Sequence, residues 1–403
     1  MKLLSVILIL GVIEFFLYML VHHMRRDFQW LITKEDEEPS LDKKGLDSFF
    51  AKSHDPVLGW TRRPNTEGVE KGESGEVRYH IDELGSRLNQ NCGTHPPTIA
   101  CFGDSYVFCR QVEDTETWEY HLSELLETCT LNFGVGNYGL DQALLRYEQT
   151  KLPESIETVI MAFVPETICR IQSTWKHYLE FGNTFAFKPR YVLSKDGELE
   201  LIANPMQDRE DFDNYRIKLD QIIENDRFYR DKFRKFQFRF PFIISFLRNL
   251  KRNSSLIGRL LRREYYRMVG NIDPHIEDAP FEYIMNDNIR IAHQLYQDEQ
   301  SVALFTSLIK EFLRLAKSRN HRAYDLILPQ LIDLRILARN NGKTYPDVLS
   351  TLDIPEGVLL DFTPYFTERR DIEQFYVNDK YGGHISNRGN KYVAEKLSQM
   401  ITQ

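Results

Sequence analysis

The sequence predicts an α/β fold in which a parallel sheet carries helices on both faces. From about residue 98, short apolar runs alternate with segments whose apolar residues recur at helical spacing. The run at residues 158–164 is apolar along its whole length, and apolar runs that alternate with helices are typical of a parallel sheet covered on both faces. A separate apolar segment at the N-terminus predicts a membrane-spanning helix, and a long polar stretch predicts a helical insertion.

Five runs have the length and composition of buried strands. They cover residues 98–102, 130–133, 158–164, 324–328 and 358–361. The helical patterns cover residues 117–126, 140–152, 299–318 and 389–402. This alternation predicts parallel strands joined by helical crossovers.

The N-terminal segment Leu3–Val21 is apolar apart from Glu14. As a helix it would span roughly 28 Å, about the hydrocarbon thickness of a bilayer. A signal peptide would have a shorter apolar core followed by a small-residue cleavage site, whereas Arg25 and Arg26 follow here. We therefore expect an uncleaved, single-pass anchor in residues 1–26.

Two observations favour a cytoplasmic position for the remainder of the chain. Arg25 and Arg26 outweigh Lys2, and the positive-inside rule places such a flank in the cytoplasm. The five cysteines show neither CxxC nor metal-ligand spacing, so we expect mostly free thiols. Free thiols are typical of a reducing compartment.

Composition shifts predict the organisation after the anchor. Residues 27–46 are polar and acidic and suit a tether, whereas residues 47–97 are rich in turn residues and predict a small β-rich lead-in. The α/β domain then covers residues 98–403, with the helical insertion at about 185–295.

Within the insertion, residues 227–267 contain thirteen Lys and Arg, two acidic residues and many aromatics. One interpretation is a surface that binds anionic lipid headgroups or an anionic glycan. The other is a helical cap whose aromatics face the core and whose basic side chains are solvated. We expect no nucleic-acid partner, because the whole chain carries a net charge of -8 and the anchor makes lipid the nearest polyanion.

Ser105 follows the first predicted strand directly, in the segment Phe102-Gly103-Asp104-Ser105-Tyr106. Ligands bind open α/β sheets at the carboxyl ends of the strands, where this serine would lie. A serine hydroxyl needs a base to become a nucleophile. Taken alone, the segment also fits an ordinary turn.

His384 lies in a glycine-rich loop after the last predicted strand, with Asp379 five residues before it. The loop opens on the same edge of the sheet as Ser105, so the two side chains can meet. A lone histidine is more often a packed or exposed residue.

Three segments, in order, resemble blocks of the SGNH/GDSL hydrolases, a family of esterases and lipases. FGDSY (residues 102–106) resembles the GDSL block with Tyr for Leu, LNFGVGNYGLDQALL (131–145) the second block, and GGHISNRGNKYVAEKL (382–397) the fifth. The resemblance implies a three-layer, flavodoxin-like α/β domain with Ser105 as nucleophile and His384 as base. It also implies that a backbone amide around Gly136 and Asn137 helps to bind the oxyanion.

The chain departs from the family in its third block, where an Asn side chain usually donates to the oxyanion. Pro165 and Glu166 stand near that place, and neither supplies the donor. Losing one such donor costs on the order of 100- to 1000-fold in turnover. Thr167, Arg170 or Asn137 could substitute, and their spacing does not choose between them.

The triad acid is the second departure. The family usually has an acid three residues before the His, where this chain has Tyr381. Asp379 is the nearest acid, and Asp361 at the end of the last strand is a weaker candidate. A Ser–His dyad oriented by a backbone carbonyl is the third alternative.

The chemistry implied is acyl transfer, in which His384 takes the proton of Ser105 and Ser105 attacks an ester to give an acyl-enzyme. We expect a deacetylase or esterase that modifies a polysaccharide, glycan or lipid-linked glycan at a membrane surface, without metal or cofactor. The alternatives are an O-acyltransferase on the same site and a non-catalytic SGNH-like binding module. The sequence predicts neither the acyl group nor the oligomeric state.

Overall fold

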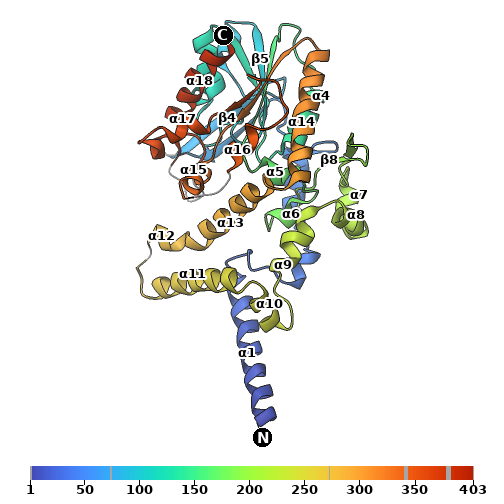
Figure 1. Ribbon diagram of the computed structural model, residues 1–403, viewed down its shortest axis with the longest axis vertical. Helices are drawn as coiled ribbons and strands as arrows, with labels where there is room; N and C mark the ends of the chain where they lie inside the picture. The colour runs from blue at the N-terminus through green and yellow to red at the C-terminus, as the bar shows by residue number, and fades with distance from the viewer. Residues whose placement is uncertain (1, 73–74, 272, 340–343, 378–382, 403) are drawn as a thin grey trace. The chain divides into compact units, whose positions relative to one another are not determined.

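A computed structural model describes residues 2–72, 75–271, 273–339, 344–377 and 383–402 (Figure 1). The chain forms two compact units. The first unit comprises residues 1–49, 173–187 and 208–287, and the second comprises residues 50–172, 188–207 and 288–403. Each unit is described by itself.

The second unit is built on a five-stranded sheet in which every neighbouring pair of strands is parallel. Its strands in chain order are β5 (Pro97–Gly103), β6 (Cys129–Asn132), β7 (Thr158–Phe163), β10 (Arg322–Ile327) and β11 (Leu359–Asp361). Their spatial order is β11-β10-β7-β5-β6. Counted along the chain this is 2-1-3-4-5, the flavodoxin-like order of a doubly wound fold. The predicted α/β class and parallel sheet are confirmed.

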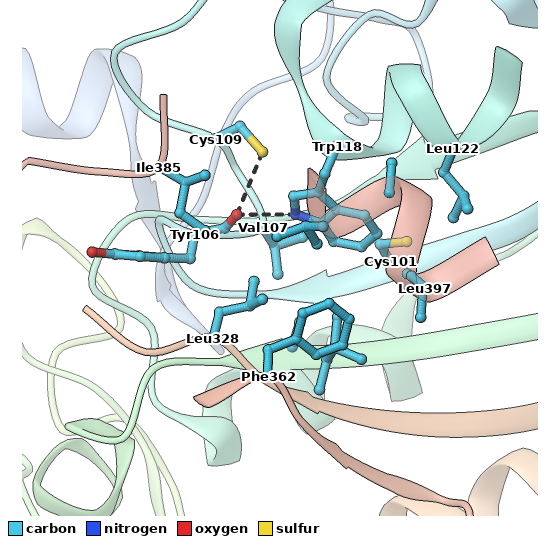
Figure 2. Close-up of a cluster of buried hydrophobic side chains, with 14 of the residues drawn as sticks. Cys101, Tyr106, Val107, Cys109, Trp118, Leu122, Leu328, Phe362, Ile385 and Leu397 are labelled. Atoms are coloured by element: carbon cyan, nitrogen blue, oxygen red, sulfur yellow. Dashed lines mark hydrogen bonds between the residues drawn. The ribbon is translucent and has the colours of Figure 1, made fainter. Parts of the chain in front are cut away.

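Helices cover both faces of this sheet, which gives three layers (Figure 1). On one face, the ring of Phe102 in β5 packs against the ring of Tyr147 in α4 (Leu140–Gln149), with their centroids 5.2 Å apart. The Tyr147 ring in turn packs against Phe312 of α14 (Glu299–Ser318), with a centroid distance of 5.6 Å. On the other, Cys101 lies in an apolar cluster with Trp118 of α3 (Trp118–Leu126) and with α18 (Asn387–Ile401) (Figure 2). Successive strand residues point to opposite faces, so β5 contributes to both cores.

The remaining elements of the second unit are short. They are β1 (His54–Asp55), β2 (Gly59–Trp60), β3 (Thr66–Lys71), β4 (Glu76–Ile81), α5 (Thr167–Arg170), β8 (Arg190–Leu193), β9 (Leu199–Ile202), α15 (Leu331–Leu337), α16 (Tyr345–Leu349) and α17 (Thr363–Thr367). The pairs β1–β2, β3–β4 and β8–β9 are antiparallel. The β8–β9 pair belongs to the second unit, so residues 185–295 are not one continuous helical insertion.

The expectation of free thiols is wrong for Cys92 and Cys129, which form a disulfide with their Cα atoms 4.7 Å apart. The parallel pairing of β5 with β6 places Cys129 opposite Pro97, so the chain just before β5 passes beside Cys129. This proximity has no signature in cysteine spacing. Cys101, Cys109 and Cys169 are buried and are not part of this disulfide. Because disulfides persist in oxidising compartments, one of the two grounds for a cytoplasmic position is lost.

The first unit begins with α1 (Lys2–Met24), and residues Leu3–Met24, with a mean hydropathy of 2.6, are long and apolar enough to cross a membrane. The segment after it is packed rather than a polar tether. Leu31 and Ile32 are fully buried, and the Ile32 carbonyl accepts the backbone N–H of Phe238 at 2.8 Å. An apolar stretch within an acidic segment therefore anchors this part of the chain.

The other helices of the first unit are α6 (Lys176–Leu179), α7 (Arg209–Asp213), α8 (Leu219–Glu224), α9 (Arg234–Phe236), α10 (Phe242–Arg248), α11 (Leu250–Met268) and α12 (Pro274–Glu277). Helices α2 (Lys43–Lys52) and α13 (Ala279–Leu295) run from one unit into the other.

In the basic segment 227–267, buried aromatic side chains fit the helical-cap interpretation, whereas Lys232 and Arg252 are buried and paired rather than solvated. Phe228, Phe233 and Phe238 are buried. The Lys232 ammonium donates to the Leu179 carbonyl, and Arg252 lies 3.6 Å from Asp287. The exposed basic side chains are those of Arg230, Lys235, Arg248, Lys251, Arg259 and Arg262.

Candidate active site

Ser105 follows the C-terminal end of β5, as the sequence predicts. Gly103 ends the strand with φ +156°, and a Cβ built there would collide with the carbonyl oxygen of Ala162 on β7. Only glycine lets the chain turn this close to the neighbouring strand. The turn carries Ser105 to the carboxyl edge of the sheet, at the point where the strand order reverses between β5 and β7.

Asp104 fixes the turn on either side of the serine. One carboxylate oxygen accepts the backbone N–H of Tyr106 at 2.8 Å, and the other accepts the N–H of Val164 at 3.1 Å. The second oxygen also accepts a hydrogen bond from Nη1 of Arg170 at 3.1 Å. Burial raises the pKa of Asp104, and the charge of Arg170 opposes that shift. Asp104 thereby joins the Ser105 turn to the end of β7.

His384 is brought to Ser105 by the residues next to each of them. Tyr106 and Ile385 lie in one apolar cluster, where Figure 2 shows them side by side. The Tyr106 hydroxyl donates to the Gly383 carbonyl at 3.2 Å, and its ring lies 5.1 Å from the imidazole. With both loops held in this way, Nε2 of His384 lies 3.0 Å from Oγ of Ser105.

Gln111 orients the imidazole from its other side. Its Oε1 accepts both the backbone N–H of His384 and Nδ1–H of the ring, each at 2.9 Å, while its Nε2 donates to the Lys71 carbonyl at 3.3 Å. Because an amide oxygen only accepts, Nδ1 must carry the proton and Nε2 presents its lone pair. This is the tautomer that can take a proton from Ser105.

A buried arginine shapes the loop that presents Gln111. The guanidinium of Arg87 donates to the carbonyls of Phe108, Cys109 and Val112 at 2.6–2.7 Å and to Asp114 at 2.8 Å. Gln111 itself has φ +71° within this loop. The clamp therefore fixes an unusual backbone conformation where the histidine partner is needed.

Gln111 is not predicted from the sequence, because the expected partner of the histidine is an acid close to it in the chain. The only available signal was that Gln111 lies six residues after Ser105 on the same loop. The predicted acid, Asp379, lies outside the described residues. The weaker candidate, Asp361, caps a turn instead, since its carboxylate accepts the backbone N–H of Thr363 at 2.9 Å.

The surroundings of His384 keep it neutral. Burial, followed by the positive charges of Arg110 and Arg170, lowers its pKa from the usual value to about 3. The Arg110 guanidinium is partly exposed and pairs with Glu70 at 2.9 Å. A neutral imidazole can accept a proton at any pH near neutrality, but these neighbours do not stabilise the imidazolium that results.

The loop that carries Gly136 and Asn137 opens on the same sheet edge as Ser105. It follows β6, the neighbour of β5, and the Val135 N–H donates to the Gly103 carbonyl at 3.0 Å. The Gly136 carbonyl accepts the indole N–H of Trp60 at 3.0 Å. Asn137 is exposed with φ +69°.

Thr167 and Arg170 brace the loops around the site. The Thr167 hydroxyl accepts the N–H of Leu140 at 2.8 Å. Arg170 donates to Asp104, to Glu166 at 2.7 Å and to the Tyr138 carbonyl at 3.2 Å. The negative charge of Glu166, which stands where the resemblance expects an oxyanion donor, is thus paired with Arg170. Through these contacts Thr167 and Arg170 stabilise the loops around the site, a role that their spacing in the sequence does not predict.

No family model matches the chain, and no curated protein matches it. Among solved structures, a candidate lipolytic protein of the G-D-S-L family from Desulfitobacterium hafniense DCB-2 is 10% identical with a TM-score of 0.32, and the match covers 75% of this chain and 98% of that one. Another is 12% identical with a TM-score of 0.34, covering 76% of this chain and 95% of the other. The fold is defined by its own strand order, not by these similarities.

Proposed function

We propose that the chain is a serine-dependent O-acyl ester hydrolase that acts at a membrane surface. The observation that carries the proposal is the 3.0 Å contact between Oγ of Ser105 and Nε2 of His384 at the carboxyl edge of a parallel sheet. A hydroxyl, a base in the accepting tautomer and an orienting group are the parts that nucleophilic acyl transfer requires. Gln111 supplies the third part.

The reaction proceeds in two halves. Nε2 of His384 takes the proton as Oγ of Ser105 attacks the ester carbonyl, and the tetrahedral oxyanion faces the backbone N–H groups of Ser105 and of the Gly136–Asn137 loop. Collapse expels the alcohol, which receives the proton from His384. Water then repeats the sequence on the acyl-enzyme and releases the acid. Gln111 keeps the proton on Nδ1 throughout.

The substrate class that fits best is an ester on a glycan or lipid-linked glycan. Support comes from α1, which is apolar enough to hold the chain at a bilayer, and from the exposed basic residues of α11, which suit an anionic headgroup region. With a sugar hydroxyl in place of water, the same acyl-enzyme would perform O-acyl transfer.

Aryl-acetate hydrolysis by the full-length chain in detergent tests the proposal. Ser105→Ala and His384→Ala should each lower kcat by at least ~1000-fold, as removal of a nucleophile or its base does in serine hydrolases. Matched controls are Ser155→Ala and His95→Ala, whose side chains lie outside the site. Hydrolysis that survives in both site variants would contradict the proposal. A wild-type rate no faster than that of Ser105→Ala would favour a non-catalytic binding module.

A sugar acceptor added to the same assay separates hydrolysis from transfer. An esterase should release free acetate at a rate that the acceptor does not change. Acetylated sugar formed faster than free acetate would reassign the site to an O-acyltransferase.

A further inference from the structure

The one acid in the apolar N-terminal helix has a defined structural partner. The carboxylate of Glu14 accepts the backbone N–H groups of Phe242 and Ile243, the latter at 2.9 Å. These are the first two residues of α10, whose N–H groups have no partner within the helix itself. Figure 1 shows α10 beside α1, and both belong to the first unit. Glu14 therefore caps a second helix from within α1.

Other polar groups around α10 are also paired inside the protein. The Ser245 hydroxyl accepts the N–H of Arg239 at 3.2 Å and donates to its carbonyl at 2.7 Å. At the far end, the Asn253 amide donates to the carbonyls of Ser245 and Phe246 at 3.3 and 3.1 Å. Hydrocarbon admits backbone only when its polar groups are paired internally, and the groups named here are paired in that way.

The outer surface of the same segment is apolar. Residues 240–247 carry no charge and are bounded by Arg239 and Arg248. Phe240, Ile244 and Leu247 are 78%, 48% and 58% exposed. Scattered apolar residues are common on soluble surfaces, but a contiguous exposed set marks an interaction site. Here it continues the exposed apolar surface of α1.

A cavity of about 640 Å³ lies between α1 and this segment. Leu10, Phe15 and Tyr18 line it from α1, and Phe240, Ile243 and Ile244 line it from the other side. Glu14 is also part of the lining, with its carboxylate turned to the N–H groups of α10. Such a lining fits the acyl chain of a lipid.

The position of Glu14 along α1 sets the depth of the segment. Glu14 lies ten residues before Met24, which corresponds to about 15 Å along a helix. That is about half the thickness of a bilayer's hydrocarbon core. A segment whose first helical N–H groups bind Glu14 therefore reaches the interior of the bilayer if α1 crosses it.

We propose that residues 239–250 form a re-entrant membrane wedge that enters the bilayer beside α1, is held there by Glu14, and shares with α1 a groove filled by lipid acyl chains. The wedge is too short to span the bilayer, so the chain returns to the surface. There α11, drawn crosswise to α1 in Figure 1 and tied to Asp27 through Arg267 at 3.3 Å, lies along the headgroups. The inference rests on the proposed membrane crossing of α1, and it is independent of the esterase chemistry.

Spin-label accessibility tests the wedge in the full-length chain, reconstituted in nanodiscs of phosphatidylcholine and phosphatidylglycerol. Labels go onto Ile244→Cys and Leu247→Cys, with Ile217→Cys as a matched control because Ile217 is an 83% exposed apolar residue of the same unit outside the wedge. A label on Leu8→Cys reports whether α1 itself lies in lipid, because the Leu8 side chain is 70% exposed. Cys101, Cys109 and Cys169 are buried and give little background labelling.

We expect the labels at positions 244, 247 and 8 to collide with lipid-soluble dioxygen at least ~3-fold more than with water-soluble nickel–EDDA, and the label at 217 to show the reverse, because apolar dioxygen concentrates in hydrocarbon. The wedge is overturned if nickel access at positions 244 and 247 equals that at 217 while position 8 lies in lipid. In that case α1 still crosses the membrane. Nickel access at position 8 as well means that the anchor itself has failed. Shielding of 244 and 247 from both reagents means a protein partner covers them, which also overturns the wedge.

Glu14→Ala tests the role of the carboxylate. Combined with the label at 244, it should raise nickel access several-fold, because the uncapped start of α10 withdraws toward water. Val12→Ala is the matched control, since Val12 is 62% exposed on α1 and does not line the cavity. Equal nickel access in the two variants would overturn the role assigned to Glu14.

Discussion

Gln111 in the second unit and Glu14 in the first perform the same task in different surroundings. Each uses side-chain oxygen to accept two N–H groups: Gln111 binds the backbone and ring of His384, and Glu14 binds the first two residues of α10. Gln111 is neutral and Glu14 is an acid. At the start of a helix, partial positive charge stabilises an acid, so the carboxylate fits there. Beside His384, a neutral amide leaves the imidazole without a counter-charge.

The charged groups near the proposed site follow the same division. Asp104 and Glu166 each pair with Arg170 and hold the loops, whereas Ser105 and His384 are neutral. Full charges near the site therefore maintain geometry, while the reacting pair depends on hydrogen bonds.

Gln111→Ala should have the largest effect. Without its amide oxygen the imidazole can rotate and change tautomer, and misplacement of a catalytic group costs on the order of 100-fold in kcat. Steady-state kinetics on an aryl acetate would check this, with Gln90→Ala, an exposed glutamine of the same unit, as the control. An unchanged kcat would show that another residue orients His384.

Gln111→Glu should change the pH dependence rather than only the rate. A carboxylate against Nδ1–H stabilises the imidazolium and raises the pKa of His384, which is about 3 in the native site. The wild-type kcat/KM should therefore stay flat from about pH 8 down to pH 5, while the variant should lose activity below about pH 6.5, the usual range of histidine. Identical profiles would contradict the role of the neutral partner.

Glu119 extends the comparison to a buried acid with a weaker partner. Its carboxylate accepts the Cys109 thiol at 3.4 Å, and burial raises its pKa to about 8. Because the folded pKa exceeds the unfolded one, its stabilising contribution is complete below about pH 4.5 and is lost as the pH rises to 8. Denaturant unfolding at several pH values should show that Glu119→Gln removes a slope of at most about 1.4 kcal/mol per pH unit. Parallel pH curves for both proteins would contradict the raised pKa.

Glu14→Ala should have the smallest effect on global stability. Loss of a helix cap costs about 1 kcal/mol of unfolding free energy, and Glu14→Gln, which keeps one accepting oxygen, should cost less. Unfolding in detergent, with Val12→Ala as control, measures both. Equal losses for the Gln and Ala variants would show that α10 requires the charge of Glu14 and not only an accepting oxygen.

The sheet and the proximity of Ser105 to His384 could be predicted, because both depend on local sequence patterns. Apolar runs mark the strands, and the carboxyl ends of parallel strands gather on one edge, so Ser105 and His384 were expected there although the chain between them is long. The predicted pairing of Ser105 with His384 agrees with the distance in the structure.

The partners of that pair could not be predicted, because they depend on how loops close. Gln111 is placed beside His384 by a loop whose shape depends on the hydrogen bonds that Arg87 donates to its carbonyls. Arg170 could not be distinguished from an oxyanion donor before its contacts with Asp104 and Glu166 were known. The Cys92–Cys129 bond likewise depends on strand register, which cysteine counting does not report.

Covalent labelling with a fluorophosphonate, read by intact mass and peptide mapping, tests whether Ser105 is the nucleophile. Ser105 with a neutral His384 as its base should be phosphonylated in the wild type, and Ser105→Ala should take up no label. Phosphonylation of another residue, or equal labelling of both proteins, would contradict the assignment of Ser105 as the nucleophile.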